Sequence, residues 1–181
     1  MQSIIETGAK MALLGLVVGK EGNISVRCSG GFLITASGSF LGRLSEDDVV
    51  PVLEGKQGSS RAASTETEVH AGIYRDNPGV NAVVHAHPVH LIAASMTRFG
   101  PEKPVLMENK EDIWFAFLGP HPPGSPGLVR AVRQGVEQGH NVVIARAHGA
   151  FAVGETLEEA FWRMVRAEKE FKVRALSRLL G

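Results

Sequence analysis

The sequence predicts an α/β fold in which helices cover the faces of a mixed or mostly antiparallel central sheet. Segments with apolar residues at helical spacing alternate along the chain with short apolar runs of strand length. Several neighbouring strand candidates are joined by short turns that contain glycine, which is typical of antiparallel hairpins. A purely parallel sheet would need a long crossover after each strand, so the pattern disfavours it.

The first quarter of the chain begins with an expected helix. From residue 3 to about residue 18, apolar residues recur at helical spacing until glycines interrupt the pattern. The segment NISVRCSGGFLITASG then predicts two short strands that meet at a Gly-Gly pair. Ser45, with Asp48 three residues later, predicts one capped helical turn. The polar segment VLEGKQGSSRAAS predicts a surface loop.

A second helix is expected to begin near Ser64 or Thr65 and to end before Pro78, because the residue before a proline disfavours helical backbone. Residues 80–87 form an apolar run that predicts a strand. The segment VHLIAASM after it predicts another helix.

The second half of the chain continues the alternation. Residues 103–127 are rich in proline and glycine, so they are expected to be mainly loop with one short strand at 114–117. Residues 128–138 predict a helix, and NVVIARAHGAFAVG predicts two strands that fold about one glycine. The final helix is expected to open with a capping box that pairs Thr156 with Glu159.

Composition excludes several classes of function. The 181 residues suit one domain, and no repeat or linker divides residues 1–181. Nineteen basic residues balance nineteen acidic ones, so no global charge favours nucleic acid or an anionic membrane as a partner. The sequence contains no apolar run of transmembrane length and no signal-peptide pattern. With Cys28 as the single cysteine, an internal disulfide is excluded and a cytoplasmic location is expected.

Two histidines stand one residue apart at the end of an expected strand. In NAVVHAHP, His85 and His87 occupy positions i and i+2, so both side chains project from the same face of the strand. Their separation, roughly 7 Å by strand rise, suits two ligands of one tetrahedral ion. The alternative is a pair of polar residues at a sheet edge.

Two further residues could complete a metal site. His148 ends another expected strand, in ARAHG, before a glycine that permits a tight turn, and Glu66 stands at the expected start of a helix. Three imidazoles and one carboxylate suit zinc or another divalent ion. A carboxylate that can leave the ion could also serve as a general base. The alternatives are a packed core histidine and a carboxylate that stabilises the helix dipole.

The other histidines have weaker patterns. His70 lies four residues after Glu66 on the same helix face, so it is either a partner of that carboxylate or a packed histidine. His90, His121 and His140 have no partner in the sequence, and we expect them to be structural.

Three loops carry residues that can bind phosphate. Asn23 enters a strand in GNISVR, Ser37 and Gly38 leave the next strand in TASGS, and Ser64 and Thr65 precede a helix in ASTE. The free N–H groups and the dipole of a helix N-terminus favour phosphate, and loop N–H groups and hydroxyls can complete a cradle. Each residue could instead serve in a turn or a cap. Because the ASTE hydroxyls adjoin the candidate base, phosphate and base would be neighbours.

These motifs, in this order, resemble the class II aldolase/adducin family, and within it the L-fuculose-1-phosphate aldolases. The matching motifs are GNISVR, TASG, STE, NAVVHAHP and AHGAFAVG, with the helix that follows, and they extend over about residues 22–172. The pattern is specific, because Glu66 precedes His85 by nineteen residues and a single His-Gly pair follows about sixty residues later.

The resemblance implies a three-layer α/β/α sandwich around a mixed, mostly antiparallel sheet. It implies zinc, or another divalent metal, held by His85, His87 and His148, with Glu66 as general acid/base and resting ligand. It implies phosphate contacts from Asn23, Ser37, Gly38, Ser64 and Thr65. The implied reaction is retro-aldol cleavage of a ketose 1-phosphate to dihydroxyacetone phosphate and an aldehyde, in a homotetramer with active sites at subunit interfaces.

Other functions are known on the fold that the resemblance implies. A ribulose-phosphate 4-epimerase would recapture the aldehyde on its other face, and a methylthioribulose-phosphate dehydratase would use Glu66 to abstract a proton before water is lost. Adducin head domains are structural modules without the metal ligands, all of which stand in this sequence. Two differences from the fuculose-phosphate aldolases bear on the substrate. The only tyrosine is Tyr74, and Lys20 stands where those aldolases carry a threonine near the phosphate.

Overall fold

The computed structural model describes residues 1–53, 61–97 and 103–181. Within these residues, seven strands form one sheet in the order β3-β2-β1-β4-β7-β6-β5. Every neighbouring pair is antiparallel except β5 and β6, which are parallel. The predicted mixed, mostly antiparallel sheet is therefore confirmed, as is the α/β class.

The described elements follow the predicted alternation. The helices are α1 (Gln2–Leu13), α2 (Thr67–Asp76), α3 (Val89–Met96), α4 (Pro126–Glu137) and α5 (Leu157–Leu180). The strands are β1 (Asn23–Cys28), β2 (Gly31–Thr35), β3 (Val49–Leu53), β4 (Ala82–Ala86), β5 (Phe115–Leu118), β6 (Val142–Ala145) and β7 (Gly149–Gly154). Short 3-10 turns at 41–43, 46–48 and 107–109 complete the connections.

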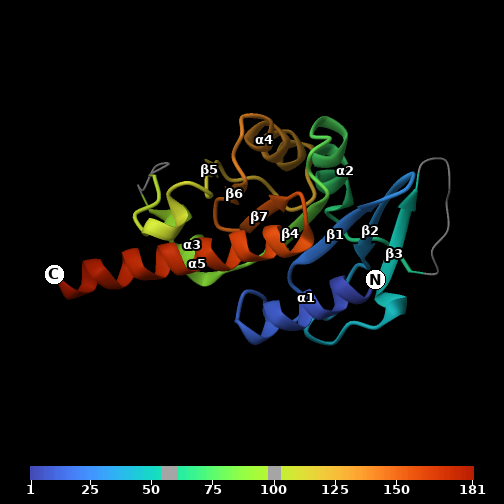
Figure 1. Cartoon of the computed structure of the whole chain (residues 1–181), viewed down its shortest axis with the longest axis horizontal. Helices are drawn as coiled ribbons and strands as arrows, with labels where there is room; N and C mark the ends of the chain where they lie inside the picture. The colour runs from blue at the N-terminus through green and yellow to red at the C-terminus, as the bar shows by residue number, and fades with distance from the viewer. Residues whose placement is uncertain (54–60, 98–102) are drawn as a thin grey trace.

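Helices cover both faces of the sheet (Figure 1), so the three-layer arrangement is present. On one face α1, α3 and α5 pack against the sheet and share an apolar core that includes Met11, Val84 and Met164. On the other face α2 and α4 pack together over a second core that includes Ile73 and Val83. Successive residues of a strand alternate between the two cores, as the pleat requires.

The face of β4 that carries the histidines follows from this alternation. Ala82, Val84 and Ala86 belong to the core beneath α1, α3 and α5, whereas Val83 belongs to the core beneath α2 and α4. His85 has the parity of Val83, so it points to the α2 side of the sheet, where the start of α2 lies.

Several boundaries differ from the predictions. Helix α1 ends at Leu13 and not near residue 18, because Gly15 adopts the left-handed conformation at φ 69°. Helix α2 begins at Thr67, two or three residues after the predicted start. Strand β4 stops at Ala86, so His87 lies just beyond it. Strand β6 stops at Ala145, so His148 lies in the turn after it and does not end the strand.

Strand β3 was not predicted by the sequence pattern. It contains Pro51, which has no N–H for the ladder and disfavours a central strand. The structure accommodates this proline because β3 is the edge strand of the sheet. The predicted loop begins at Val52, so the structure contradicts it at Val52 and Leu53, which belong to β3. Residues 54–60 of the predicted loop lie outside the described residues.

The predicted caps are largely confirmed. Ser45 and Asp48 form the reciprocal capping box. The hydroxyl of Thr156 accepts from the N–H of Glu159, while the Glu159 carboxylate accepts from the N–H of Glu155 instead of the cap residue itself. Within the described part of the chain, no helix is long and apolar enough to cross a membrane.

Candidate metal centre

The four predicted metal residues meet at one end of the sheet. His85 is the fourth residue of β4, and His87 follows the strand after one alanine. His148 belongs to the tight turn between β6 and β7, and β7 is paired with β4. Glu66 is the residue that caps α2 at its N-terminus. Residues from three separate parts of the sequence therefore converge on the α2 side of the sheet.

The distances are those of a ligand cluster. The ligand nitrogens of His85, His87 and His148 all lie within 4.8 Å of one another. The carboxylate of Glu66 approaches two of these rings, with Oε2 at 2.9 Å from His85 Nε2 and Oε1 at 3.4 Å from His148 Nε2. Glu66 and His85 are buried, and His87 and His148 are half-buried toward the cavity.

The hydrogen bonds leave several acceptor atoms facing one another. His85 Nδ1 lies 2.9 Å from the carbonyl oxygen of Ala150, which only accepts, so Nδ1 carries a proton. In the neutral ring, Nε2 then presents its lone pair to Glu66 Oε2 and to His87 Nε2, which is 3.0 Å away. Such acceptors repel one another unless a proton or a metal cation lies between them. The donor set, three imidazoles and a carboxylate, fits a divalent ion.

The charges of these groups at neutral pH also suit a metal. Burial raises the pKa of Glu66, but the positive charge and the hydrogen bond that a protonated His85 supplies, together with a hydrogen bond from Asn23, outweigh it and hold the pKa at about 2. Burial lowers the pKa of His87 to about 3, and it lowers the pKa of His148 in the same direction. Glu66 is therefore anionic and the two imidazoles are neutral, which are the protonation states that bind metals.

All five predicted phosphate residues line the same cavity as the metal cluster. The cavity has a volume of about 280 Å³. Its predicted lining residues are Asn23, Ser37, Gly38, Ser64, Thr65, Glu66, His85, His87 and His148. The TASG and ASTE loops are tied together, because the N–H of Ser37 donates to the carbonyl of Ala62 and Ala36 bridges Ala63. The amide of Asn23 donates to Glu66 Oε2 at 3.1 Å and so links the two halves of the cavity.

The structure adds residues that the motifs did not indicate. Lys20 and Glu21 line the cavity from the loop before β1, and Ser39 and Pro123 line it from two other loops. A neighbouring cavity of about 340 Å³ shares Pro123 and His148 with it and is lined by Pro120, His121, Pro122, Arg146 and Ala147. Lys20 differs from the threonine that the resemblance implies near the phosphate, whereas the other positions lack a local sequence signal.

Three of the remaining four histidines have structural partners. His70 is fully buried, and its Nδ1 lies 2.6 Å from the hydroxyl of Ser25, which also contacts the Tyr74 hydroxyl at 2.7 Å. His90 pairs with Glu168 at 2.6 Å, and His140 contacts the carbonyl of Gly135. His121 lines the neighbouring cavity.

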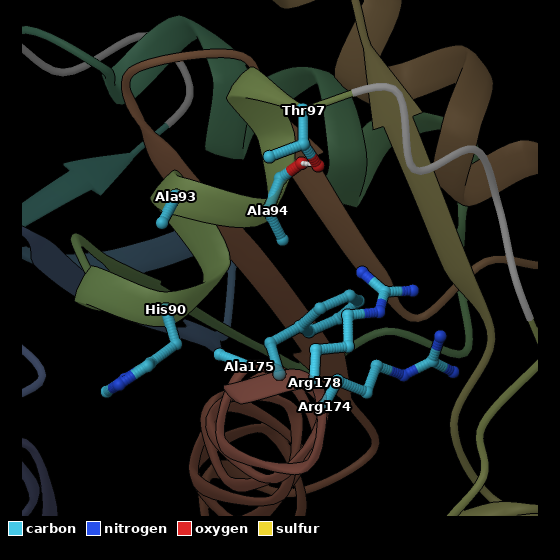
Figure 2. A pocket seen from close by; sticks show the side chains of 8 residues that line it. His90, Ala93, Ala94, Thr97, Arg174, Ala175 and Arg178 are labelled. Atoms are coloured by element: carbon cyan, nitrogen blue, oxygen red, sulfur yellow. Dashed lines mark hydrogen bonds between the residues drawn. The ribbon is translucent and has the colours of Figure 1, made fainter. Parts of the chain in front are cut away.

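A third pocket lies away from this cluster, between α3 and α5 (Figure 2). Ala93 and Ala94 line it from α3, Thr97 lines it from the position just after that helix, and Arg174 and Arg178 line it from α5. None of the predicted metal or phosphate residues is among its lining residues. The predicted metal and phosphate residues therefore all belong to the cavity at the end of β4.

The chain is similar to known proteins over most of its length. The family model described as "Class II Aldolase and Adducin N-terminal domain" matches residues 2–175. An L-fuculose phosphate aldolase of Haemophilus influenzae is 31% identical over 172 residues, which cover 89% of this chain and 75% of the relative. A 5-methylthioribulose-1-phosphate/5-deoxyribulose-1-phosphate aldolase of Escherichia coli is 30% identical over 163 residues, which cover 89% of this chain and 76% of the relative.

Solved structures show the same fold. The crystal structure of L-fuculose-1-phosphate aldolase from Thermus thermophilus superposes with a TM-score of 0.89 at 31% identity, covering 99% of this chain and 94% of that one. A sugar-phosphate aldolase from Thermotoga maritima superposes with a TM-score of 0.88 at 24% identity, covering 99% and 95% of the two chains.

The buried His70 makes stability depend on pH. Burial lowers the pKa of His70 from 6.5 to about 3, so between these pH values the unfolded chain binds a proton that the folded chain does not. The free energy of unfolding therefore falls as the pH falls below about 6.5, by about 1 kcal/mol per pH unit from this group. Urea unfolding at pH 7 and pH 5 in the presence of a chelator measures this change in the free energy of unfolding.

The free energy of unfolding of His70→Gln should change less steeply with pH than that of the parent chain, by about 1 kcal/mol per pH unit, because the glutamine does not titrate. His140→Gln, at a half-buried helix end, is the matched control. An equal pH slope in the parent chain and His70→Gln would contradict the prediction.

Proposed function

The chain belongs to the class II aldolase and adducin family, and from this premise we propose that it is a metal-dependent sugar-phosphate aldolase. The proposed reaction is retro-aldol cleavage of a ketose 1-phosphate, of which L-fuculose 1-phosphate is the leading candidate, to dihydroxyacetone phosphate and an aldehyde. One observation carries the proposal: a cluster of three histidines and one carboxylate opens into the same cavity as a set of hydroxyl, amide and backbone N–H groups.

The histidines are proposed to hold Zn²⁺ or another divalent ion. His85, His87 and His148 offer three nitrogens, which is the number of protein ligands typical of a catalytic zinc site with an open position. When bound, such an ion supplies positive charge that stabilises the negative charge developing on the ketone side of the broken bond. His85 is held for this task by the carbonyl of Ala150 and by stacking on Phe151, with ring centroids 4.1 Å apart.

Glu66 is proposed as the general acid/base. Cleavage requires a base that removes the proton of the hydroxyl next to the breaking carbon–carbon bond, and a proton must later reach the carbon that is left. Glu66 is ionised at neutral pH, because its pKa is about 2, and it lies at the junction of the histidines and the ASTE loop. Its Oε2 is held by Asn23 and His85, which leaves Oε1 without a hydrogen-bond partner among the described residues.

The phosphate is proposed to bind at the other end of the cavity. Ser37, Ser64 and Thr65 contribute hydroxyls there, and Gly38 has a positive φ of 70° that exposes the loop backbone. Lys20 also lines this cavity and adds a positive charge. The phosphate would therefore fix one end of the substrate while its carbonyl and hydroxyl groups reach the histidines.

We also propose that the chain assembles as a homotetramer with active sites at subunit interfaces. Leu13 and Val18 have 85% and 70% of their surface exposed, and the N–H of Val18 donates to Glu21, which lines the cavity. Exposed apolar side chains in this segment are suited to burial against another subunit. The protein is expected to elute with four times the mass of one chain, which multi-angle light scattering measures, and a monomer would contradict it.

Purified protein is expected to carry about one divalent ion per chain. Glu66→Gln should retain that ion through the three histidines but lose turnover by roughly two to four orders of magnitude, the usual contribution of a general base. Elemental analysis and a turnover assay on the same preparation measure both quantities.

Glu68→Gln, an exposed acidic residue in the first turn of α2, is the matched control and should keep full turnover. Protein without metal that zinc fails to activate would argue against the metal site. Normal turnover in Glu66→Gln would remove this residue from the mechanism.

The reaction itself can be tested with a panel of ketose 1-phosphates. The aldolase should release dihydroxyacetone phosphate, detected by coupled reduction, from L-fuculose 1-phosphate or from 5-deoxyribulose 1-phosphate and 5-methylthioribulose 1-phosphate. The last two are included because the Escherichia coli relative is named for them. Epimerised or dehydrated products, formed without dihydroxyacetone phosphate, would contradict the aldolase proposal and would indicate an epimerase or a dehydratase.

A further inference from the structure

The backbone just before His148 is held in an unfavourable conformation. Ala147 has φ 55°, and it is the one residue other than glycine with positive φ among residues 1–53, 61–97 and 103–181. An L-residue in this left-handed region is disfavoured by roughly 1–2 kcal/mol, because its Cβ crowds the following carbonyl. Such a conformation persists where surrounding contacts determine it, and it is often found at functional sites.

Ser95 accepts a hydrogen bond from the N–H of Ala147. It lies in α3, is buried with 7% of its surface exposed, and its hydroxyl accepts the N–H of Ala147 at 3.0 Å. The same hydroxyl donates to the carbonyl of Ile92 at 2.6 Å, which fixes its rotamer. Helix α3 packs against β6 and β7, the two strands that the turn connects. Ser95 is not among the residues that line the pocket between α3 and α5 in Figure 2.

The ring of His148 depends on its backbone more than the ring of His85 does. His85 Nδ1 is held by the carbonyl of Ala150, whereas His148 Nδ1 is buried without a hydrogen-bond partner among the described residues. The turn also has little freedom to adjust on the other side. A Cβ at Gly149 would lie 2.4 Å from the carbonyl oxygen of Ala86 and 2.8 Å from Cδ2 of His87.

We propose that Ser95 is a positioning residue of the metal site, acting through the left-handed backbone of Ala147 to aim His148 at the ion. The inference rests on the proposed metal-dependent function and adds to it a residue that touches neither metal nor substrate. Without the hydroxyl, the N–H of Ala147 loses its acceptor and the residue can relax to negative φ. The ring of His148, whose Nδ1 has no hydrogen-bond partner among the described residues, would then move away from the other two nitrogens.

The test is a titration of the metal-free protein with Co²⁺ alone, followed by the visible absorption of the bound ion and by elemental analysis. Ser95→Ala is expected to bind Co²⁺ at least tenfold more weakly than the parent chain, as is usual when the support of a ligand is removed. Ser177→Ala is the matched control, because Ser177 likewise donates to the carbonyl three residues earlier in its helix but lies far along α5.

Two further variants separate the backbone route from a loss of packing. Ser95→Ala combined with Ala147→Gly should recover most of the lost affinity, because glycine adopts positive φ without the Cβ penalty. Ala147→Val, at an exposed position, should weaken binding even with Ser95 intact, because a β-branched residue is disfavoured in this region. The Ala147→Val arm tests the proposal should Ser95→Ala fail to fold, which circular dichroism reports.

The outcomes are distinguishable. A parent chain that binds no divalent ion would overturn the proposed function, and the role of Ser95 with it. A parent chain that binds Co²⁺, with Ser95→Ala binding within twofold of it, would overturn the role of Ser95 alone. A double variant that recovers nothing would overturn the route through Ala147.

Discussion

The site depends on one electrostatic constraint: a buried carboxylate and several imidazole nitrogens face one another at hydrogen-bonding distance. His85 Nε2 lies 2.9 Å from Glu66 Oε2 and 3.0 Å from His87 Nε2. Lone pairs at such distances repel, so the arrangement is favourable only with a shared cation or proton. The surrounding fold supplies the burial and the hydrogen bonds that keep these groups from moving apart.

The sheet order brings these groups together. Strand β4 lies between β1 and β7, so Asn23 pairs with His85 on one side and Phe151 pairs with it on the other. One neighbour thereby supplies the amide that holds Glu66, and the other supplies the ring on which His85 stacks. The turn that carries His148 leads directly into β7, so the third nitrogen arrives at the same end of the sheet. A helix cap, a strand end and a hairpin turn are common features of protein structures. The candidate site forms because the sheet order places these three side by side.

The parts that the sequence could predict are those with a local cause. The H-x-H pair projects to one face because of the strand period, and the hairpins β1–β2 and β6–β7 follow from their glycines. Strand β3 was not predicted because its proline is tolerated only in an edge strand, and the position of a strand at the edge depends on the order of the whole sheet. The role proposed for Ser95 was not predicted for a similar reason. A serine within a helix has no signal of its own, and its importance comes from the N–H of Ala147, which lies 52 positions away in the sequence.

The residues that would distinguish one substrate from another also lack a local sequence signal. Aldolases named for fuculose phosphate and for methylthioribulose phosphate both resemble this chain at about the same identity, 31% and 30%. In the proposed reaction, a ketose 1-phosphate of either kind would present the same phosphate and the same carbonyl, so the proposed phosphate-binding residues and the histidines would not distinguish the two. Discrimination must come from groups that meet the aldehyde portion beyond the bond that breaks. Among the described residues, the neighbouring cavity that shares His148 is lined by three prolines, together with His121 and Arg146. Its prolines have fixed φ and no N–H, so they would select by shape, and the two polar side chains by charge or hydrogen bonding.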